Sequence, residues 1–397
     1  MITYKFTYDK TIGVFLRKVT KMIYLDHAAT TKIDKEVLHV FNEASERYYG
    51  NASSLHDLGT EANQALEQAR IALAQTIGAE SEEVVFTSGG TEANQLAILT
   101  LLNSVKKKGK HLLTTRIEHS SIYNLFQKLE KEGYEVTYLT VDESGLVSLE
   151  EIKQEIRKDT VLAAIQHVNS EIGVIQNIKS IGKILTKEKI LFHSDLIQSY
   201  GKINLNVKAL NLSSAAISSH KIYGPKGIGM TYFSKAINYH PYHFQATHEY
   251  GFRPGTVDVP SVLSFAYAGQ TAMRNIENNQ NRAIKLRHLF ESRVKEVEDI
   301  SVHSHETNQL PDIIGVSITG IQGQYAMLEC NRHSIAISTG TACQIGQTTP
   351  SRTMISMGKS DVEAKELIRI STGNQTKEKE INDLADVLIE LSKEMIV

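Results

Sequence analysis

The segment Val84–Asn94, which reads VVFTSGGTEAN, decides the fold class that the sequence predicts. An apolar β-branched run opens it, and helix-forming residues follow Gly89 and Gly90. The two glycines let the backbone approach a ligand closely, and the helix N-terminus supplies free N–H groups and a positive dipole end. Because the segment matches neither the Walker loop nor the dinucleotide fingerprint, it favours a small phosphorylated cofactor. The alternative is a plain βα turn with Thr91 as the helix cap.

Short β-branched runs alternate with helical patterns on both sides of this segment, up to about residue 235, which is typical of a doubly wound α/β domain. The expected strands are 22–26 at an edge, 84–86, 111–115, 135–139, 161–165, 190–193, 215–218 and 228–233. The expected helices are 62–77, 91–104 and 121–132. One long helix over 261–297 is then expected to lead into a smaller α/β unit with strands at 313–318, 335–338 and 367–371 and a final helix at 377–396.

The composition is that of an ordinary globular protein of roughly two domains, with 397 residues, 41% of them hydrophobic. Its 43 Lys plus Arg nearly balance 45 Asp plus Glu, for a net charge of −2, which argues against a nucleic-acid partner. No apolar run approaches the roughly 20 residues of a membrane span. Cys330 and Cys343 are too few for a disulfide scaffold and lack zinc spacing, so we expect a reducing, cytoplasmic setting and no bound metal.

The first 21 residues are basic but lack the continuous apolar core of a secretory signal. A second methionine, Met22, opens the first expected strand. We therefore predict that residues 1–21 are a dispensable extension and that translation can begin at Met22.

A second segment, 218–229, reads SSHKIYGPKGIG and places Lys221 at the end of an expected strand. A lysine amine held there can form a Schiff base with a carbonyl cofactor, although a lone lysine is usually a solvated surface residue. Asp195 follows the strand over 190–193, where it can pair with a protonated pyridine nitrogen; the alternative is a turn or capping residue. Together with the glycine loop, these residues suggest pyridoxal phosphate.

A third segment, 338–347, reads STGTACQIGQ and has no periodicity. It predicts an exposed, mobile loop that presents Cys343 as a nucleophile. The alternative is a buried cysteine acting as a small hydrophobic residue, which suits Cys330 in its apolar helical setting.

From Met22 to its C-terminus the chain resembles the NifS/IscS-type cysteine desulfurases, which are fold-type-I pyridoxal-phosphate enzymes. The resemblance rests on YLDHAATT at 24–31, YGN at 49–51, SS at 53–54, His56, SGGTEAN at 88–94, EH at 118–119, VN at 168–169, EIG at 171–173, SSHKIYGPKG at 218–227, RPGT at 253–256 and TGTAC at 339–343. Departures from the usual pattern occur at Ala52, Ser170, Ser219, 245–248 and 372–374, none of which carries an assigned catalytic role.

The resemblance implies roles for individual residues. Lys221 would form the Schiff base, with Lys226 rejected; His119 would stack on the pyridine ring and relay protons; and Cys343 would be the nucleophile. The cofactor would otherwise be held by Gly90, Thr91, Ser218 and His220 at the phosphate, Asp195 at the ring nitrogen, Asn169 and Gln198 at the ring hydroxyl, and Thr256 from the neighbouring subunit of a homodimer. Arg369, whose planar fork suits a carboxylate, would bind the substrate together with Asn169.

The implied fold has a large domain, 32–275, with a mostly parallel seven-stranded sheet, and a discontinuous small α/β domain, 22–31 plus 276–397. The implied reaction takes sulfur from L-cysteine, leaving L-alanine and a persulfide on Cys343. An acceptor protein would then receive the sulfur for iron–sulfur cluster assembly, thiamine synthesis or tRNA thiolation. The alternatives are a selenocysteine lyase, a related pyridoxal-phosphate lyase or aminotransferase, and, last, a docking or regulatory subunit without enzymatic activity.

Overall fold

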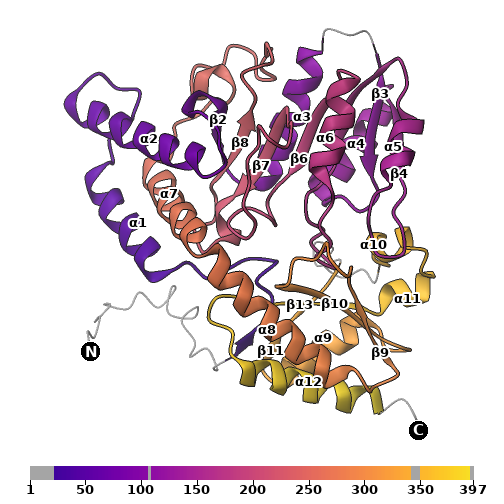
Figure 1. The fold of residues 1–397 in the computed structure, drawn as a ribbon. Helices are drawn as coiled ribbons and strands as arrows, with labels where there is room; N and C mark the ends of the chain where they lie inside the picture. Colours follow the sequence, from indigo (N-terminus) through magenta and orange to yellow (C-terminus); the bar gives the residue numbers. More distant parts are fainter. Residues whose placement is uncertain (1–21, 106–108, 341–348, 394–397) are drawn as a thin grey trace, which may run out of the picture.

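The computed structural model describes residues 22–105, 109–340 and 349–393. A seven-stranded sheet forms the upper part of the molecule in Figure 1, in the order β2-β8-β7-β6-β5-β3-β4. Its strands are β2 (Val84–Thr87), β3 (His111–Thr115), β4 (Glu135–Leu139), β5 (Thr160–Ala164), β6 (Leu191–Asp195), β7 (Ser214–Ser218) and β8 (Gly229–Phe233). Strand β8 runs antiparallel to both of its neighbours, β2 and β7, and the other pairs in this sheet are parallel. The predicted mostly parallel sheet is therefore confirmed.

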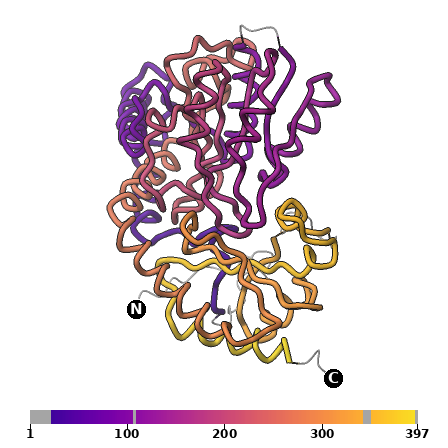
Figure 2. The backbone as a smooth tube through the Cα atoms, turned by 45° about the vertical axis from the view of Figure 1, so that its right-hand side comes forward, coloured from indigo at the N-terminus to yellow at the C-terminus, as the bar shows by residue number. Residues whose placement is uncertain are grey.

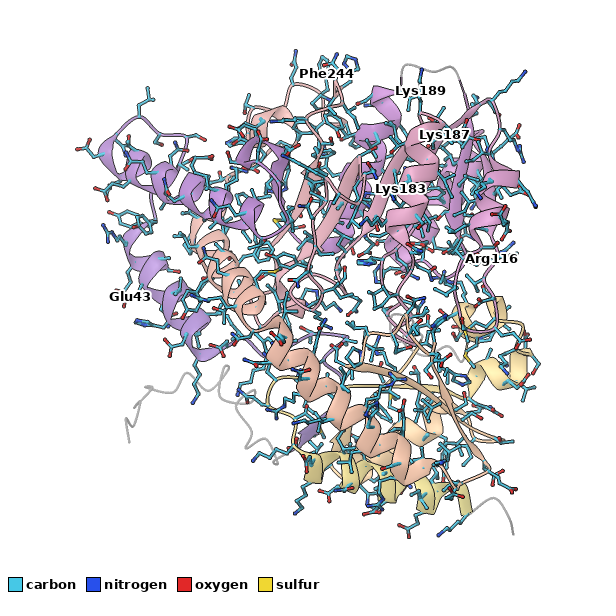
Figure 3. The ribbon with its side chains drawn as sticks, in the orientation of Figure 1. Glu43, Arg116, Lys183, Lys187, Lys189 and Phe244 are labelled. Carbon is cyan, nitrogen blue, oxygen red and sulfur yellow. The ribbon has the colours of Figure 1, made fainter. Side chains whose placement is uncertain are left out.

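Helices cover both faces of this sheet (Figure 1). They are α1 (Lys35–Arg47), α2 (Asp57–Gln75), α3 (Gly90–Ser104), α4 (Ser120–Lys131), α5 (Leu149–Glu155), α6 (Ile178–Lys187) and α7 (Val259–Arg274), with short 3-10 turns η2 (Ser81–Glu83), η3 (Ser219–Lys221) and η4 (Glu249–Gly251). Strands β2, β3, β5, β7 and β8 are buried along their whole length, which explains their nearly continuous apolar sequences. Lys183 and Lys187 lie on α6, with Lys189 just beyond its end (Figure 3).

A smaller unit lies below the large sheet (Figures 1 and 2). Its four-stranded antiparallel sheet has the order β12-β13-β10-β9. The elements are β9 (Ile300–His303), β10 (Ile313–Ile318), β12 (Ser338–Thr339), β13 (Leu367–Ser371), α8 (Ile276–Val294), α9 (Gly323–Arg332), α10 (Arg352–Ser356), α11 (Asp361–Lys365) and α12 (Glu378–Lys393).

The start of the described chain lies against this smaller unit. Strand β1 (Ile23–Tyr24) pairs in parallel with β11 (Ile335–Ala336), and Asp26 bridges to Ser371 of β13. Leu25 packs in one hydrophobic cluster with residues of α8, α9, β13 and α12. The pairing brings the segment 22–31 together with the C-terminal third of the chain.

Two expectations about secondary structure were wrong. The long helix expected over 261–297 is two helices, because Asn275 between α7 and α8 has φ −111° and ψ 7°, and its side-chain amide donates to the carbonyl of Thr271. The strand expected over 335–338 is split, since β11 pairs with β1 whereas β12 pairs with β13 in the other sheet. No helix in the described ranges is long and apolar enough to cross a membrane.

Candidate active site

The glycine segment forms the turn from β2 into α3, as predicted. Gly89 is the N-cap of α3 and has φ 144°, a conformation that favours glycine. A β carbon on Gly90 would lie 2.2 Å from Ile197 Cδ1, so a side chain has no room there. A hollow of about 400 Å³ opens at this point, lined by Thr30, Ser88, Gly89, Gly90, Thr91, Glu92, Ser218, His220, Lys226 and Gly227. The structure thus brings together all four residues predicted to bind phosphate.

Two polar side chains, Ser218 and His220, line this hollow and could donate hydrogen bonds to a ligand. Ser218 is 1% exposed, and none of the described residues offers its Oγ a hydrogen bond. His220 Nδ1 lies 3.1 Å from Thr30 Oγ1, and burial, with the charges of Lys221 and Lys226, lowers the pKa of His220 to about 4. An anion placed in the hollow would meet a serine hydroxyl, a neutral imidazole and the N-terminus of α3.

Asp195 is the last residue of β6 rather than a residue beyond it, and it is held by two donors. Asn94 Nδ2 donates to its Oδ2 at 2.8 Å, and the Ile197 N–H donates to its Oδ1 at 2.9 Å. Asn94 is itself fixed, because His193 Nε2 lies 2.9 Å from its Oδ1. Burial lowers the pKa of His193 to about 3, so this imidazole is neutral. The carboxylate of Asp195 is therefore anchored at the carboxyl edge of the large sheet, as a partner for a cationic ring nitrogen.

His119 is the N-cap of α4, and it is connected to the same hydrogen-bond network. Asn94 Nδ2 donates to Ser121 Oγ at 3.0 Å, and Ser121 Oγ lies 2.8 Å from His119 Nδ1. The Ser121 N–H also donates to this Nδ1, so the ring proton is assigned to Nε2 from the hydrogen-bond network. Burial lowers the pKa of His119, with Lys221 and Arg352 adding to the shift and Asp195 opposing it. The histidine is a neutral group able to take up a proton.

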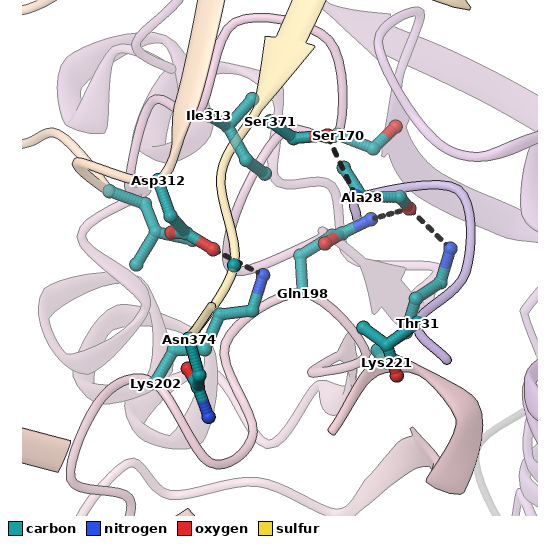
Figure 4. Close-up of polar contacts among 12 residues, drawn as sticks. Ala28, Thr31, Ser170, Gln198, Lys202, Lys221, Asp312, Ile313, Ser371 and Asn374 are labelled. Atoms are coloured by element: carbon teal, nitrogen blue, oxygen red, sulfur yellow. Dashed lines mark hydrogen bonds and ion pairs between the residues drawn. The ribbon is translucent and has the colours of Figure 1, made fainter. Parts of the chain in front are cut away.

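Lys221 ends the short turn η3 that follows β7. Its Nζ donates to the carbonyl of Ala28 (Figure 4) and to that of Ala29, the latter at 2.7 Å. Burial lowers the pKa of Lys221 to about 7; Arg369 and Lys202 add to the shift, and Asp26 and Asp195 oppose it. A substantial fraction of this amine is therefore unprotonated near neutral pH.

Lys226, which the sequence analysis rejected, is exposed and lines the hollow described above. Lys221 instead lines a neighbouring cavity of about 120 Å³, together with Lys202 and Asp312, which form an ion pair of 2.7 Å (Figure 4). The two lysines of the segment thus differ in their surroundings, and only Lys221 is held by polar contacts at the end of β7.

Arg369 is a buried residue of β13, 5% exposed. Its Nη2 donates to Asp26 Oδ1 at 2.8 Å and its Nη1 to the carbonyl of Ser170 at 2.9 Å. The third donor, Nε, is buried and has no hydrogen-bond partner among the described residues. A carboxylate ligand would satisfy such a donor.

The remaining predicted residues occupy different places. Asn169 is 1% exposed; its Oδ1 accepts from the N–H groups of Glu171 and Ile172, so it holds the local turn. Gln198 Nε2 donates to Ala28 at 3.0 Å, while its Oε1 is buried with no partner in the described ranges. Thr256 is exposed. Cys343 and the extension 1–21 lie outside the described residues.

Cys330 is 0% exposed, and burial raises the pKa of its thiol to about 12. The prediction that this cysteine packs as a small hydrophobic residue is confirmed.

These residues fit pyridoxal phosphate. The hollow beside α3 is bordered by Ser218, whose buried Oγ has no hydrogen-bond partner among the described residues and could donate to a phosphate oxygen. Asp195 supplies an anchored carboxylate for the ring nitrogen, and the orphaned Gln198 Oε1 supplies an unused acceptor. Lys221 supplies the amine for the aldehyde.

Sequence reasoning did not assign roles to several residues that complete this arrangement. Asn94 holds Asp195, Ser121 orients His119, and Asp26 pairs with Arg369. Asn94 had a detectable signal, since it belongs to the SGGTEAN segment on which the family resemblance rests. Nothing in the local sequence of Asp26 shows that its partner lies 343 residues away.

A half-buried lysine, an anchored aspartate and a phosphate-type hollow lie at one edge of a large, mostly parallel sheet, an arrangement consistent with the fold-type-I class of proteins. The chain belongs to the Aminotransferase class-V family, whose model matches residues 23–384. Among its relatives are a putative cysteine desulfurase NifS of Bacillus subtilis, 43% identical over 366 residues, or 91% of this chain and 93% of that protein, and the cysteine desulfurase IscS of Dictyoglomus turgidum, 36% identical over 367 residues, or 92% and 93%.

Solved structures are similar over the same range. A NifS-like protein matches with a TM-score of 0.87 at 30% identity, covering 94% of this chain and all of that one. A structure described as SspA in complex with cysteine matches with a TM-score of 0.76 at 32% identity, covering 88% and 98%. The predicted fold class and the predicted NifS/IscS relationship are confirmed.

Proposed function

We propose that this protein is a cysteine desulfurase that uses pyridoxal phosphate. The names of its relatives favour this activity over a selenocysteine lyase or a docking subunit. The observation that carries the proposal is Lys221, a half-buried lysine with a pKa lowered to about 7, at the same sheet edge as the anchored Asp195. This combination serves Schiff-base chemistry and has no evident use in a protein that only docks.

Each side chain has a task that follows from its contacts. When bound, pyridoxal phosphate supplies an aldehyde that condenses with amines and a ring that withdraws electrons. Lys221 would offer a neutral amine to that aldehyde, and the carboxylate of Asp195 would hold a proton at the ring nitrogen. Arg369, through its free Nε and its fork, binds the carboxylate of L-cysteine. His119, neutral and with a fixed tautomer, accepts and returns a proton.

Cys343 takes the sulfur. Its thiolate forms a bond to the sulfur atom of the substrate while the Cβ–S bond of the substrate breaks. The electron pair of that bond stays on Cβ, which is protonated, so L-alanine leaves and Cys343 carries a persulfide. No external oxidant is needed, because the sulfur–sulfur bond forms at the expense of the carbon–sulfur bond. The persulfide then passes to an acceptor protein, for which an iron–sulfur scaffold is the first choice and other sulfur-requiring pathways are alternatives.

We also propose that the enzyme is a cytoplasmic homodimer in which Thr256 reaches the partner's phosphate site. Large apolar side chains are left uncovered in the single chain, including Leu55 at 100%, Phe244 at 89% and Tyr49 at 69% exposure. Figure 3 labels Phe244. Exposed apolar groups of this size are typical of an interaction surface. Sedimentation at several concentrations tests this point, and a monomer at all of them would contradict it.

The central experiment incubates purified protein with L-cysteine and a thiol, and measures sulfide and alanine for the wild type, Cys343→Ala and Lys221→Ala. We expect both products from the wild type and neither from the variants. Normal sulfide release by Cys343→Ala would exclude the persulfide route and favour a lyase. Normal release by Lys221→Ala would exclude this lysine as the Schiff-base residue.

A further inference from the structure

Arg352 is the first residue of the short helix α10, and the residues on either side of it fix its place in the fold. Ser351, the N-cap of this helix, and Thr353 both form side-chain hydrogen bonds with Glu171. Asn169 Nδ2 also donates to Thr353 Oγ1 at 3.2 Å. Both neighbours of Arg352 are buried, so the backbone that carries this arginine is held against the loop that follows β5.

The guanidinium of Arg352 contacts the chain on both sides of His119. Its Nη2 donates at 3.0 Å to the carbonyl of Glu118, the residue before the histidine. It also lies 3.9 Å from the centroid of the Tyr123 ring, and the Tyr123 N–H donates to the carbonyl of His119 in the first turn of α4. A cation over an aromatic ring is attracted to its face. One side chain of the smaller unit thus joins the peptide before His119 to the helix after it.

The acidic neighbour of His119 turns its side chain toward the large sheet. Glu118 Oε1 accepts from Thr115 Oγ1 at 2.8 Å and from the Gln166 N–H at 3.0 Å. Burial raises the pKa of Glu118 to about 8, so this carboxyl group is largely neutral at pH 7. It therefore does little to cancel the charge of Arg352.

Three charged groups of the described chain act on His119. Burial lowers the pKa of this histidine; Asp195 opposes the shift, whereas Lys221 and Arg352 add to it. Asp195 and Lys221 already have tasks toward the cofactor. Arg352 is the cation among the three that the proposed reaction leaves without a task.

We propose that Arg352 is a positioning residue for proton transfer, which holds His119 by clamping the peptide before it to the helix after it. The inference rests on the proposed desulfurase function and adds a residue to it. A proton-accepting side chain must lie within hydrogen-bond reach of its proton and must be neutral when it acts. The contacts of Arg352 serve the first need, and its charge serves the second, because a nearby cation disfavours the protonated imidazole.

The test compares Arg352→Met, Arg352→Lys and Tyr123→Leu with the wild type, all loaded with cofactor. We expect Arg352→Met to lower kcat for alanine formation from L-cysteine about tenfold, because the base is displaced. Its KM should stay within about twofold, since Arg352 is not assigned to substrate binding. Tyr123→Leu removes the ring beneath the guanidinium but keeps the cation, so it should lower kcat by a smaller factor.

Arg116→Met is the matched control. The Arg116 guanidinium lies 5.0 Å from the centroid of the Tyr138 ring, so it forms a second arginine–tyrosine stack, three residues before His119. Arg116 is exposed and is labelled in Figure 3. Because it does not contact the chain on both sides of His119, its removal should leave kcat and KM at their wild-type values.

A second readout needs no turnover. NMR of the cofactor-loaded protein, labelled with ¹³C at histidine Cε1, follows the titration of His119, whose signal is assigned by its loss in His119→Gln. We expect the pKa of His119 to be higher in Arg352→Met than in the wild type and unchanged in Arg116→Met. Arg352→Lys keeps the cation without the planar fork, so it should retain the wild-type pKa and only part of kcat. The acid limb of the kcat profile should move to higher pH in Arg352→Met, in step with the NMR titration.

Three outcomes would overturn the proposal. One is a wild-type kcat together with a wild-type pKa of His119 in Arg352→Met. Another is an equal change in Arg116→Met, which would trace the effect to any cation of this loop. The third is a raised KM with unchanged kcat in Arg352→Met, which would make Arg352 a substrate-binding group. Should the wild type itself form no alanine and no sulfide from L-cysteine, the proposed function fails; that result is distinct, because the NMR titration still decides whether Arg352 acts on His119.

Discussion

Arg70 and Arg369 are both buried arginines paired with a carboxylate, yet they differ in how completely their donors are used. Arg70 donates through Nη1 and Nη2 to Glu249 and through Nε and Nη2 to Glu67, while Nη1 also reaches the carbonyl of Val84. Its guanidinium also lies 4.5 Å from the centroid of the Phe86 ring. Within the described ranges Arg369 has one carboxylate partner, Asp26, and its Nε has no hydrogen-bond partner.

The difference distinguishes a structural ion pair from a binding group. Burial lowers the pKa of Arg70, but the hydrogen bonds and charges of Glu249 and Glu67 outweigh it and raise that pKa. The charge of Arg70 is thus satisfied within the chain. Arg369 instead stands near Lys221, whose pKa it helps to lower. A buried cation with an unused donor beside a second amine carries a desolvation cost, which the binding of an anion would offset.

The largest expected effect is on stability at Arg70. Glu249→Ala leaves the buried guanidinium with only a partly exposed partner, so we expect a loss of roughly 3 to 5 kcal/mol in the free energy of unfolding. Glu67→Ala removes the carboxylate that is 37% exposed and should cost less than about 1 kcal/mol. Urea unfolding of both variants checks this. Equal losses would show that the two carboxylates do not differ as their burial implies.

The next effect is on substrate use at Arg369. Arg369→Lys loses the planar fork, and we expect kcat/KM for L-cysteine to fall about 100-fold, or about 2.7 kcal/mol, with stability changed by less than about 1 kcal/mol. Arg287→Lys is the matched control, because Arg287 Nη2 is also buried without a partner in the described ranges but lies on α8 and pairs with Glu291. A similar loss in the control would mean that an unpaired donor alone does not mark the substrate site.

A pH dependence of stability should follow from the amine beside Arg369. The pKa of Lys221 is lowered from 10.5 to about 7 in the folded protein, so between these values the unfolded chain binds the extra proton. Stability of the cofactor-free protein therefore rises with pH across that window, and the full penalty is present below pH 7. Urea unfolding from pH 6.5 to 10.5 should show the free energy of unfolding of the wild type rising relative to that of Lys221→Met. The variant Lys226→Met, at an exposed lysine, serves as control. If the stability of the wild type relative to Lys221→Met instead falls as the pH rises, the lowered pKa of Lys221 is contradicted.

The same contrast explains what the sequence can and cannot predict. Gly89, Gly90 and Lys221 were found from local patterns, because a strand, a turn and a helix N-terminus are encoded by adjacent residues. The break at Asn275 was missed, since the apolar pattern continues across it. The contacts Arg369–Asp26 and Ser351–Glu171 join residues 343 and 180 positions apart, and only the packing of β1 and β13 against the large sheet brings them together.

The smallest effect should come from the partner of Arg369. Asp26→Asn keeps an acceptor for Nη2 but removes the charge that orients the guanidinium, so we expect KM for L-cysteine to rise by up to about tenfold, or about 1.4 kcal/mol, with kcat nearly unchanged. Asp312→Asn breaks the comparable half-buried pair with Lys202 and should leave KM within about twofold of the wild-type value. Steady-state kinetics of both variants decide the matter. A KM that is unchanged in Asp26→Asn would mean that Arg369 is oriented by the Ser170 carbonyl alone, and that Asp26 belongs with the structural carboxylates of Arg70.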